Sequence, residues 1–152
     1  MVNADPITEL LERGVDEVIV KKELEKKLRS GEKITLYLGI DPTGNMLHIG
    51  HAIALRKLQS FQRLGHKVIF LIGSFTALIG DTSDKESARQ PLTQEQIEEN
   101  FKTYKKQASK ILDFSKVEIR YNGDWLSKLT FKEIIELASR FTVQQMIERE
   151  MY

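Results

Sequence analysis

Two short apolar runs, separated by a helical pattern, constrain the fold of this chain more than any other feature. Residues 34–40 (ITLYLGI) and 67–73 (KVIFLIG) are rich in β-formers and mostly apolar, which is typical of strands buried on both faces. Residues 49–64 between them have helical periodicity, and Gly65 follows as a stop signal. Strand, helix and strand within about 40 residues predict a βαβ unit with parallel strands. We therefore expect an α/β fold with a Rossmann-like parallel sheet flanked by helices.

The remaining elements are predicted from caps and periodicity. Residues 6–13 and 16–30 read as helices, the second ending at Gly31, and residues 117–121 alternate like a third strand. Capping boxes predict three later helices, at Thr93 with Gln96, Thr130 with Glu133 and Thr142 with Gln145. The first of these has the apolar stripe Ile97, Phe101, Tyr104, Ala108 and Ile111. Residues 74–91 show no clear period. Three strands are fewer than a doubly wound sheet normally has, so we expect the sheet to be incomplete towards the C-terminus.

Composition excludes several classes of function. Lys and Arg number 23 and Asp and Glu 22, so the whole-chain charge indicates neither a nucleic-acid surface nor a membrane surface. The chain has no cysteine, which excludes disulfides, Cys-ligated metals and a Cys nucleophile. No apolar run approaches the roughly 20 residues of a membrane span. The acidic N-terminal stretch does not have the order of a secretory signal, so we expect a cytoplasmic protein without a membrane partner.

The stretch MLHIGH, residues 46–51, is the strongest candidate for a site. It follows the turn DPTGN at the carboxyl end of the first expected strand, where open α/β sheets bind their ligands. A helix beginning near His48 would direct free N–H groups and its positive dipole end to that edge, which favours an anion. His48 and His51 share one helix face, and Gly50 leaves the backbone bare. A nucleotide triphosphate suits this arrangement, although the residues alone leave ordinary structural or solvated histidines equally open. A third ligand for a metal is missing, so we expect no metal site.

Four strings in order along the chain resemble one family. YLGIDPTGNMLHIGH (37–51), LIGD (78–81), RYNGDWL (120–126) and RFTVQQMIERE (140–150) are similar to the tyrosyl-tRNA synthetases, and HIGH is the class I synthetase signature. The resemblance implies an N-terminal helical segment over 1–32. It implies that residues 33–152 form the first part of a Rossmann-type catalytic domain with the start of its helical connective region. It also implies a ligase that activates tyrosine with ATP and transfers it to tRNA.

By motif position, the resemblance also implies residue roles. His48 and Thr43 would contact the ATP phosphates and His51 the ribose side, with Gly39, Asp41 and Gly50 completing the ATP site. Tyr37 would bind the phenolic hydroxyl of the substrate and Asp81 its α-ammonium group. Thr76 and Asn122 would lie near the same pocket. Lys85 and Arg89 would reach the leaving pyrophosphate.

The implied ligands and partners are ATP as a substrate with its Mg²⁺, L-tyrosine, and tRNA bound through parts beyond this chain. A homodimer is expected for the parent protein. The lysine-rich second signature of the family is not in this sequence, so we expect the 152 residues alone to be inactive. Two alternatives stay open: a tryptophanyl-tRNA synthetase, since PTG before LHIGH suits it as well, and a non-catalytic nucleotide-binding module.

Overall fold

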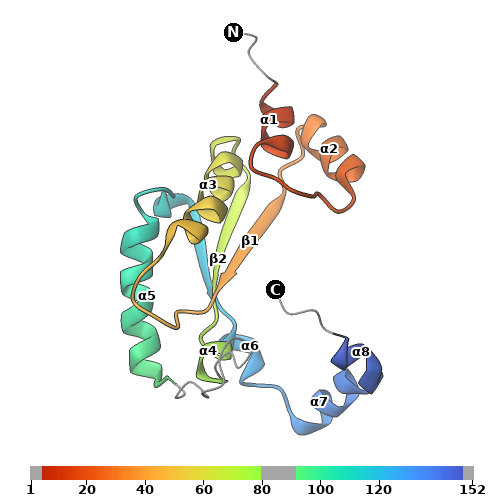
Figure 1. The fold of residues 1–152 in the computed structure, drawn as a ribbon, viewed down its shortest axis with the longest axis vertical. Helices are drawn as coiled ribbons and strands as arrows, with labels where there is room; N and C mark the ends of the chain where they lie inside the picture. The colour runs from red at the N-terminus through yellow and green to blue at the C-terminus, as the bar shows by residue number, and fades with distance from the viewer. Residues whose placement is uncertain (1–4, 80–91, 149–152) are drawn as a thin grey trace.

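The computed structural model describes residues 5–79 and 92–148, and a three-stranded parallel sheet lies at its centre (Figure 1). The strands β1 (Thr35–Ile40), β2 (Lys67–Ile72) and β3 (Val117–Tyr121) are adjacent in the order β1-β2-β3. Thr35 pairs with Lys67 and Val68 pairs with Val117, so the strands run in register. The expected α/β fold with a parallel sheet is confirmed.

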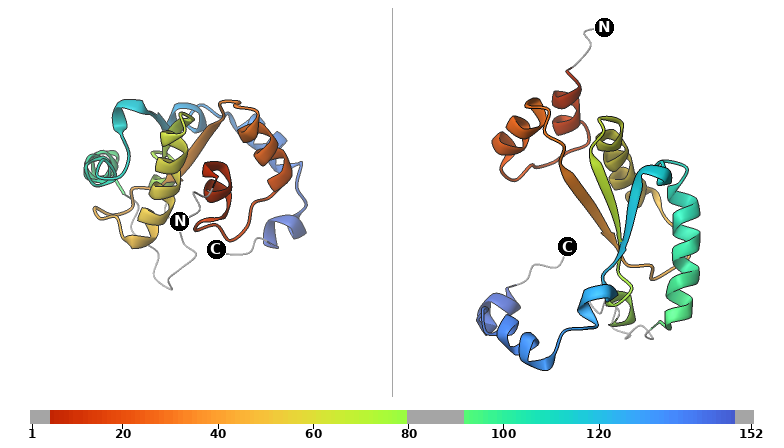
Figure 2. Two further views of the ribbon diagram at one scale, coloured as in Figure 1. Left: turned by 90° about the horizontal axis from the view of Figure 1, so that it is seen from above. Right: turned by 180° about the vertical axis from the view of Figure 1, so that it is seen from behind.

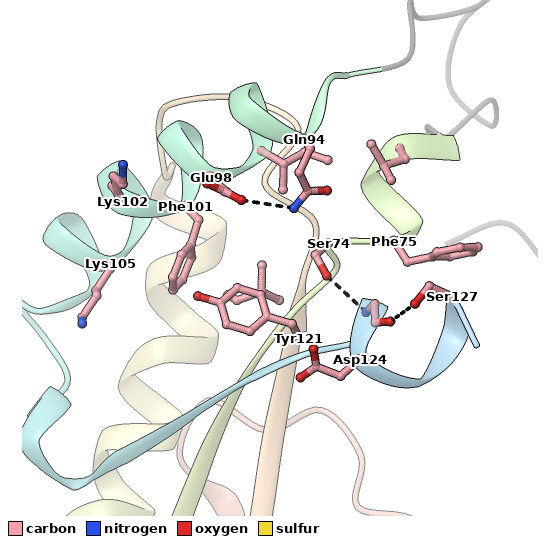
Figure 3. Close-up of a pocket in the computed structure, with 14 residues that line it drawn as sticks. Ser74, Phe75, Gln94, Glu98, Phe101, Lys102, Lys105, Tyr121, Asp124 and Ser127 are labelled. Atoms are coloured by element: carbon pink, nitrogen blue, oxygen red, sulfur yellow. Dashed lines mark hydrogen bonds between the residues drawn. The ribbon is translucent and has the colours of Figure 1, made fainter. Parts of the chain in front are cut away.

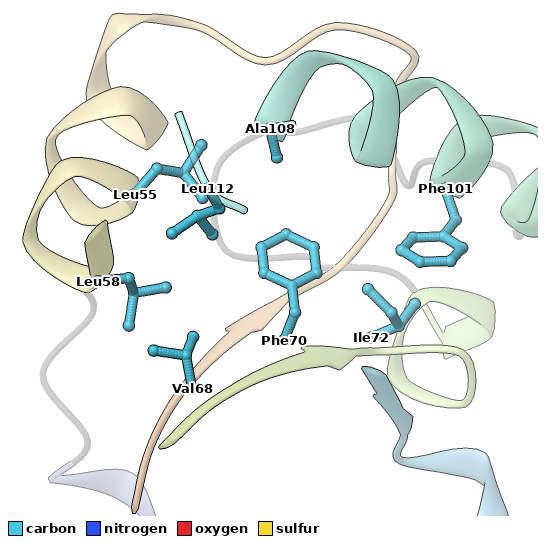
Figure 4. Close-up of a cluster of buried hydrophobic side chains, with 8 residues drawn as sticks. All are labelled: Leu55, Leu58, Val68, Phe70, Ile72, Phe101, Ala108 and Leu112. Carbon is cyan, nitrogen blue, oxygen red and sulfur yellow. The ribbon is translucent and has the colours of Figure 1, made fainter. Parts of the chain in front are cut away.

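Two long helices cover one face of this sheet. The helix α3 (Ile49–Arg63) connects β1 to β2, and α5 (Gln94–Ala108) precedes β3 on the same side (Figures 1 and 2). Alternate residues of β2 point into the layer between the strands and the helices, because side chains alternate along a strand. The resulting core consists of Val68, Phe70 and Ile72 from β2 with Leu55, Leu58, Phe101, Ala108 and Leu112 (Figure 4).

The opposite face of the sheet is accessible at β1. Tyr37 is 70% exposed there and Gly39 is exposed as well, while Leu36 and Leu38 pack against the core. Towards β3 this face is charged, because the Glu118 carboxylate is bonded to Lys67, at 2.6 Å, and to Arg120. The two faces therefore differ. The face covered by α3 and α5 forms the apolar core, and the opposite face presents the exposed Tyr37 and Gly39.

The N-terminal helices pack at the amino end of the sheet, away from the strand ends that carry the candidate site (Figure 1). The helices α1 (Pro6–Glu12) and α2 (Lys21–Arg29) bury Leu10, Leu11 and Leu28 against Phe61 of α3. The second helix was expected over 16–30 but begins five residues later. Val20 precedes it with φ at +59°, and the β-branched run before it (Val15, Val18 and Ile19) is poor at starting a helix.

The shorter elements connect and follow the strands. They are α4 (Thr76–Ile79), the 3₁₀ turn η1 (Phe114–Lys116), α6 (Gly123–Leu126), α7 (Phe131–Ala138) and α8 (Val143–Ile147). The three predicted capping boxes are confirmed at Thr93, Thr130 and Thr142. The helix α5 ends at Ala108, so Ile111 lies in the following turn, whereas the other four residues of the expected stripe are buried.

Candidate functional site at the carboxyl ends of the strands

The backbone beyond all three strands stays hydrogen-bonded and forms a continuous rim. Gly73 follows β2 and donates its N–H to the Ile40 carbonyl at 2.9 Å. Asn122 follows β3 and donates its N–H to the Ile72 carbonyl at 2.9 Å. Parallel strands end at the same edge of a sheet, so the residues directly after them are brought together.

A chain of side-chain hydrogen bonds joins three of the predicted site residues on this rim. The Asn122 amide donates to the Thr76 hydroxyl at 3.0 Å, and that hydroxyl donates to the Asp41 carboxylate at 2.6 Å. Asn122 is buried, and its amide oxygen accepts the Phe75 N–H at 2.8 Å. The Thr76 hydroxyl has one proton to give, so its bond to Asp41 leaves it an acceptor for Asn122. The network fixes the direction of each group and ties α4 to the ends of β1 and β3.

Gly73 is essential to this network and was not among the predicted site residues. A Cβ at Gly73 would lie 1.6 Å from Oδ1 of Asp41 and 2.5 Å from Oγ1 of Thr76. No side chain fits there without displacing the Asp41–Thr76 bond. The sequence signal was a glycine closing an apolar strand, which often marks a close approach of another group.

The two histidines of HIGH hold the start of α3. His48 is the N-cap residue, and its Nδ1 accepts the Gly50 N–H at 3.1 Å. Nδ1 of His51 accepts the His48 N–H at 3.2 Å, and the two ring centroids are 3.9 Å apart. A neutral imidazole that accepts at Nδ1 carries its proton at Nε2. Both rings therefore retain one N–H donor that capping does not use.

Two features shape this pair of rings: a lowered pKa at His51 and the absence of a side chain at Gly50. Burial, and then the neighbouring His48, lower the pKa of His51 below its ordinary value. A Cβ at Gly50 would lie 2.9 Å from Cε1 of His48, so the bare Gly50 makes room for the His48 ring. Gly50 therefore has a structural role in this chain. Its expected second role, to let the nucleotide approach the backbone, remains a prediction.

The other predicted residues fall in three groups. Thr43 is exposed in the turn before α3, with its N–H bonded to the Asp41 carbonyl at 2.8 Å. Tyr37 and Gly39 lie on the accessible face of β1, so Tyr37 is not a core residue of the described structure. A Cβ at Gly39 would meet only Leu71, at 4.0 Å, so nothing in the described structure itself requires this glycine. Asp81, Lys85 and Arg89 lie outside the described residues.

Comparison with known proteins decides the family. The model of the class I tRNA synthetases for tryptophan and tyrosine matches residues 29–152. The chain belongs to this family. Tyrosine–tRNA ligase 2 of Clostridium acetobutylicum is 46% identical to this class I synthetase chain over 154 aligned residues, which cover 99% of the chain and 38% of that protein. The tyrosine–tRNA ligase of Idiomarina loihiensis is 49% identical and is covered over 36% of its length. The chain thus spans well under half the length of these curated relatives.

Solved structures agree with the fold. A C-terminally truncated mitochondrial tyrosyl-tRNA synthetase of Coccidioides posadasii matches with a TM-score of 0.69 and 25% identity, over 97% of this synthetase chain and 43% of that one. The corresponding structure from Aspergillus nidulans has a TM-score of 0.71 at 20% identity, which supports the fold alone. The Rossmann-like architecture expected from the sequence is confirmed by these likenesses.

A cavity of about 630 Å³ beside the rim does not contain the predicted residues of the synthetase site. It lies between α5, the end of β3 and α6, with Phe101 and Tyr121 at its base and Glu98, Lys102 and Lys105 around it (Figure 3). Ser74 on its wall accepts the Gly123 N–H at 3.1 Å. The HIGH histidines, Tyr37 and Asp41 are absent from its lining, so the chemistry of the chain points to the rim and to the β1 face.

Residues 5–79 and 92–148 are the described parts of the synthetase chain. Within them, His, Cys, Asp and Glu side chains nowhere gather in threes as metal ligands. No helix among the same residues has both the length and the apolar character needed to cross a bilayer.

Proposed function

We propose that the intact protein carrying this chain is a tyrosine–tRNA ligase that forms tyrosyl-adenylate from tyrosine and ATP and then transfers the tyrosyl group to tRNA(Tyr). The observation that carries the proposal is the HIGH pair, in which both imidazoles cap α3 through Nδ1 and keep Nε2–H for a ligand. Curated tyrosine–tRNA ligases at 46–49% identity over nearly all of this chain support the substrate.

The reaction needs no nucleophile from the protein. A carboxylate oxygen of tyrosine forms a bond to the α-phosphorus of ATP, while the bond from that phosphorus to the bridging oxygen breaks and pyrophosphate leaves with the electron pair. Negative charge grows on the phosphate oxygens in the transition state. The Nε2–H donor of His48, at the positive end of a fifteen-residue helix, stabilises that charge, and capping has already fixed the ring before the reaction. His48 and Thr43 are assigned to the phosphates, and His51 and Gly50 to the ribose side.

Tyrosine is proposed to bind on the accessible face of β1. Tyr37 offers its hydroxyl to the phenol of the substrate, and Gly39, two residues on, leaves the strand bare for the nucleotide. Asp41 continues the same line at the rim, where Thr76 and Asn122 hold its carboxylate. Asp81 is assigned to the α-ammonium group, and Lys85 and Arg89 to the pyrophosphate.

The further ligands and the setting follow from the proposed reaction. ATP enters as the Mg²⁺ complex, with the ion held mainly by the phosphates, as is usual for this ion. The tRNA contacts and a homodimer interface are assigned to parts of the protein outside these 152 residues. Because charged tRNA is used in translation, the cytoplasm is the proposed location.

The test is ATP–pyrophosphate exchange by the intact protein with tyrosine, tryptophan or phenylalanine. Exchange dependent on tyrosine is expected. His48→Asn supplies a sharper test, because the Asn amide oxygen can accept the Gly50 N–H while the distal donor is lost. The exchange rate should fall by about 10²- to 10³-fold, as for one oxyanion donor, with tyrosine binding little changed.

Two outcomes would overturn the assignment. Exchange stimulated by tryptophan and not by tyrosine would identify the tryptophan enzyme, since the family model covers both amino acids. Nucleotide binding without exchange in the intact protein would identify a non-catalytic module.

A further inference from the structure

One face of α5 is bonded to the loop that precedes the HIGH histidines. Asn100, Tyr104 and Gln107 lie at i, i+4 and i+7, so they share one side of the helix. All three contact residues 42–47, the segment that connects β1 to His48. None of them lies in the four strings that resemble the tyrosyl-tRNA synthetases, and none was a predicted site residue.

Gln107 makes the most complete contact. Its Nε2 donates to the Asn45 carbonyl at 2.9 Å, and its Oε1 accepts the Leu47 N–H at 2.9 Å. A third bond, from Nε2 to the Thr103 carbonyl at 3.3 Å, fixes the amide against its own helix. The Gln107 amide thus satisfies two backbone groups of a non-helical turn. The second of these groups belongs to Leu47, the residue directly before the N-cap His48.

Asn100 and Tyr104 secure the other half of the loop. Nδ2 of Asn100 donates to the Pro42 carbonyl at 2.9 Å, and Pro42 is fully buried. Tyr104 is 3% exposed, and its ring centroid lies 6.4 Å from that of His51. Burial raises the pKa of Tyr104, while a hydrogen bond from the Gly44 N–H to its oxygen opposes that shift. The hydroxyl therefore stays neutral and takes part in holding the loop.

We propose that Asn100, Tyr104 and Gln107 are positioning residues for adenylate formation: α5 braces residues 42–47 and thereby aims the Nε2 donors of His48 and His51. This inference rests on the proposed function. The histidines stabilise a transition state only if their rings are held in place before the reaction, and a shift of about 1 Å can cost 10²-fold in rate. The loop has glycine at 44 and exposed residues at 43, 45 and 46, so the helix supplies the rigidity.

The chain offers a matched control for Gln107. Gln62 of α3 makes the same two-way contact with another loop: it donates to the Asp113 carbonyl at 2.9 Å and accepts the Asp113 N–H at 3.0 Å. Gln107→Leu and Gln62→Leu in the intact protein should lower the melting temperature similarly. Only Gln107→Leu should lower kcat for ATP–pyrophosphate exchange, by about 10- to 100-fold, with the KM for tyrosine within twofold. Equal kcat values for the two variants would overturn the proposal.

A second variant and a second measurement keep the test decisive. Asn100→Ala removes a single bond and should reduce kcat by less than Gln107→Leu, which guards against a variant that does not fold. Imidazole ¹⁵N spectra of the intact protein report on the rings directly once the signals of His48 and His51 have been assigned by substitution. In Gln107→Leu the signals of His48 and His51 should change, and in Gln62→Leu they should not; unchanged signals in Gln107→Leu would also overturn the proposal. The spectra do not depend on the reaction, so lack of exchange by the wild type would refute the proposed function while the positioning role was still tested.

Discussion

At the scale of single residues, two glycines differ in whether the fold itself requires them. Gly73 follows β2 and Gly39 is the last residue but one of β1, yet a Cβ would meet Asp41 at 1.6 Å in the first case and only Leu71 at 4.0 Å in the second. Gly73→Ala should destabilise the protein by about 1–3 kcal/mol, as overpacking does, and abolish most exchange because the Asp41–Thr76 bond cannot form. Urea denaturation and the exchange assay measure the two effects.

The matched variant is Gly39→Ala. Its unfolding free energy should be no lower than that of the wild type, because the added methyl group fits the strand and alanine restricts the unfolded chain. If its exchange rate nevertheless falls, the bare backbone serves the nucleotide. A Gly73→Ala protein as stable and active as the wild type would contradict the hydrogen-bonded rim described here.

His66 gives a prediction about pH. It is buried against Phe61, its Nδ1 faces the Ile34 N–H at 3.4 Å, and burial followed by Lys33 lowers its pKa below 6.5. The unfolded chain therefore takes up this proton at a higher pH than the folded chain does. Stability is full above pH 6.5 and is lost as the pH falls below it, until the folded histidine also protonates.

The measurement is urea denaturation at pH 7.5 and pH 5.5. The wild type should lose stability at the lower pH. His66→Asn keeps an acceptor near Nδ1 without a titrating ring, so it should lose less. His51 shifts in the same direction and accounts for a remaining part of the loss. An identical loss in His66→Asn and the wild type would show that His66 does not contribute.

At the scale of elements, sequence patterns predicted the strands and helices that are determined by residues close together in the sequence. The parallel sheet followed from two apolar runs, and six helices, α1, α2, α3, α5, α7 and α8, followed from caps and periodicity. The short α4 and α6 were not predicted, because each is fixed by tertiary contacts such as the Asn122 oxygen on the Phe75 N–H. HIGH was recognisable as a local string. The need for Gly73 and the brace from Gln107 were not, because their partners are 32 to 62 residues away in the sequence.

The docking of α1 is the element-scale prediction. Nζ of Lys57, on α3, donates to the Leu10 and Arg13 carbonyls at 2.8 and 2.6 Å and so closes the end of α1. Lys57→Met should lower the free energy of unfolding by about 1 kcal/mol and speed up amide hydrogen exchange in residues 7–13. The rate of ATP–pyrophosphate exchange should not change, because the rim is at the other end of the strands (Figure 1). Arg56→Met, at an exposed position of the same helix, is the control. A loss of catalytic rate in Lys57→Met would contradict the expectation that the contact between α1 and α3 does not affect the rim.

At the scale of the whole molecule, the 152 residues by themselves leave open to solvent the β1 face on which we propose that tyrosine binds. Pockets for small molecules usually bury about 70–90% of the ligand surface. Tyr37 is 70% exposed, so a tyrosine bound beside it would be covered on one side only. We predict that the chain expressed alone shows no tyrosine-dependent exchange and charges no tRNA, while the intact protein does both. Both are measured with the same assays at equal protein concentration. Activity of the 152 residues above background would contradict this prediction and would mean that the exposed face suffices.

Residues 127–148 carry about half of the exposed large apolar side chains of the described residues. All residues of this segment are exposed, and α7 and α8 extend away from the sheet (Figure 1). The segment carries nine exposed large apolar side chains: Leu129, Phe131, Ile134, Ile135, Leu137, Phe141, Val143, Met146 and Ile147. Such a surface associates in water. The isolated chain should therefore show sedimentation that depends on concentration, and Ile134→Lys with Ile147→Lys should suppress it without unfolding the sheet. Exposed Ile53→Lys on α3 is the control; suppression by this variant, or a monomer at all concentrations, would place the association elsewhere or exclude it.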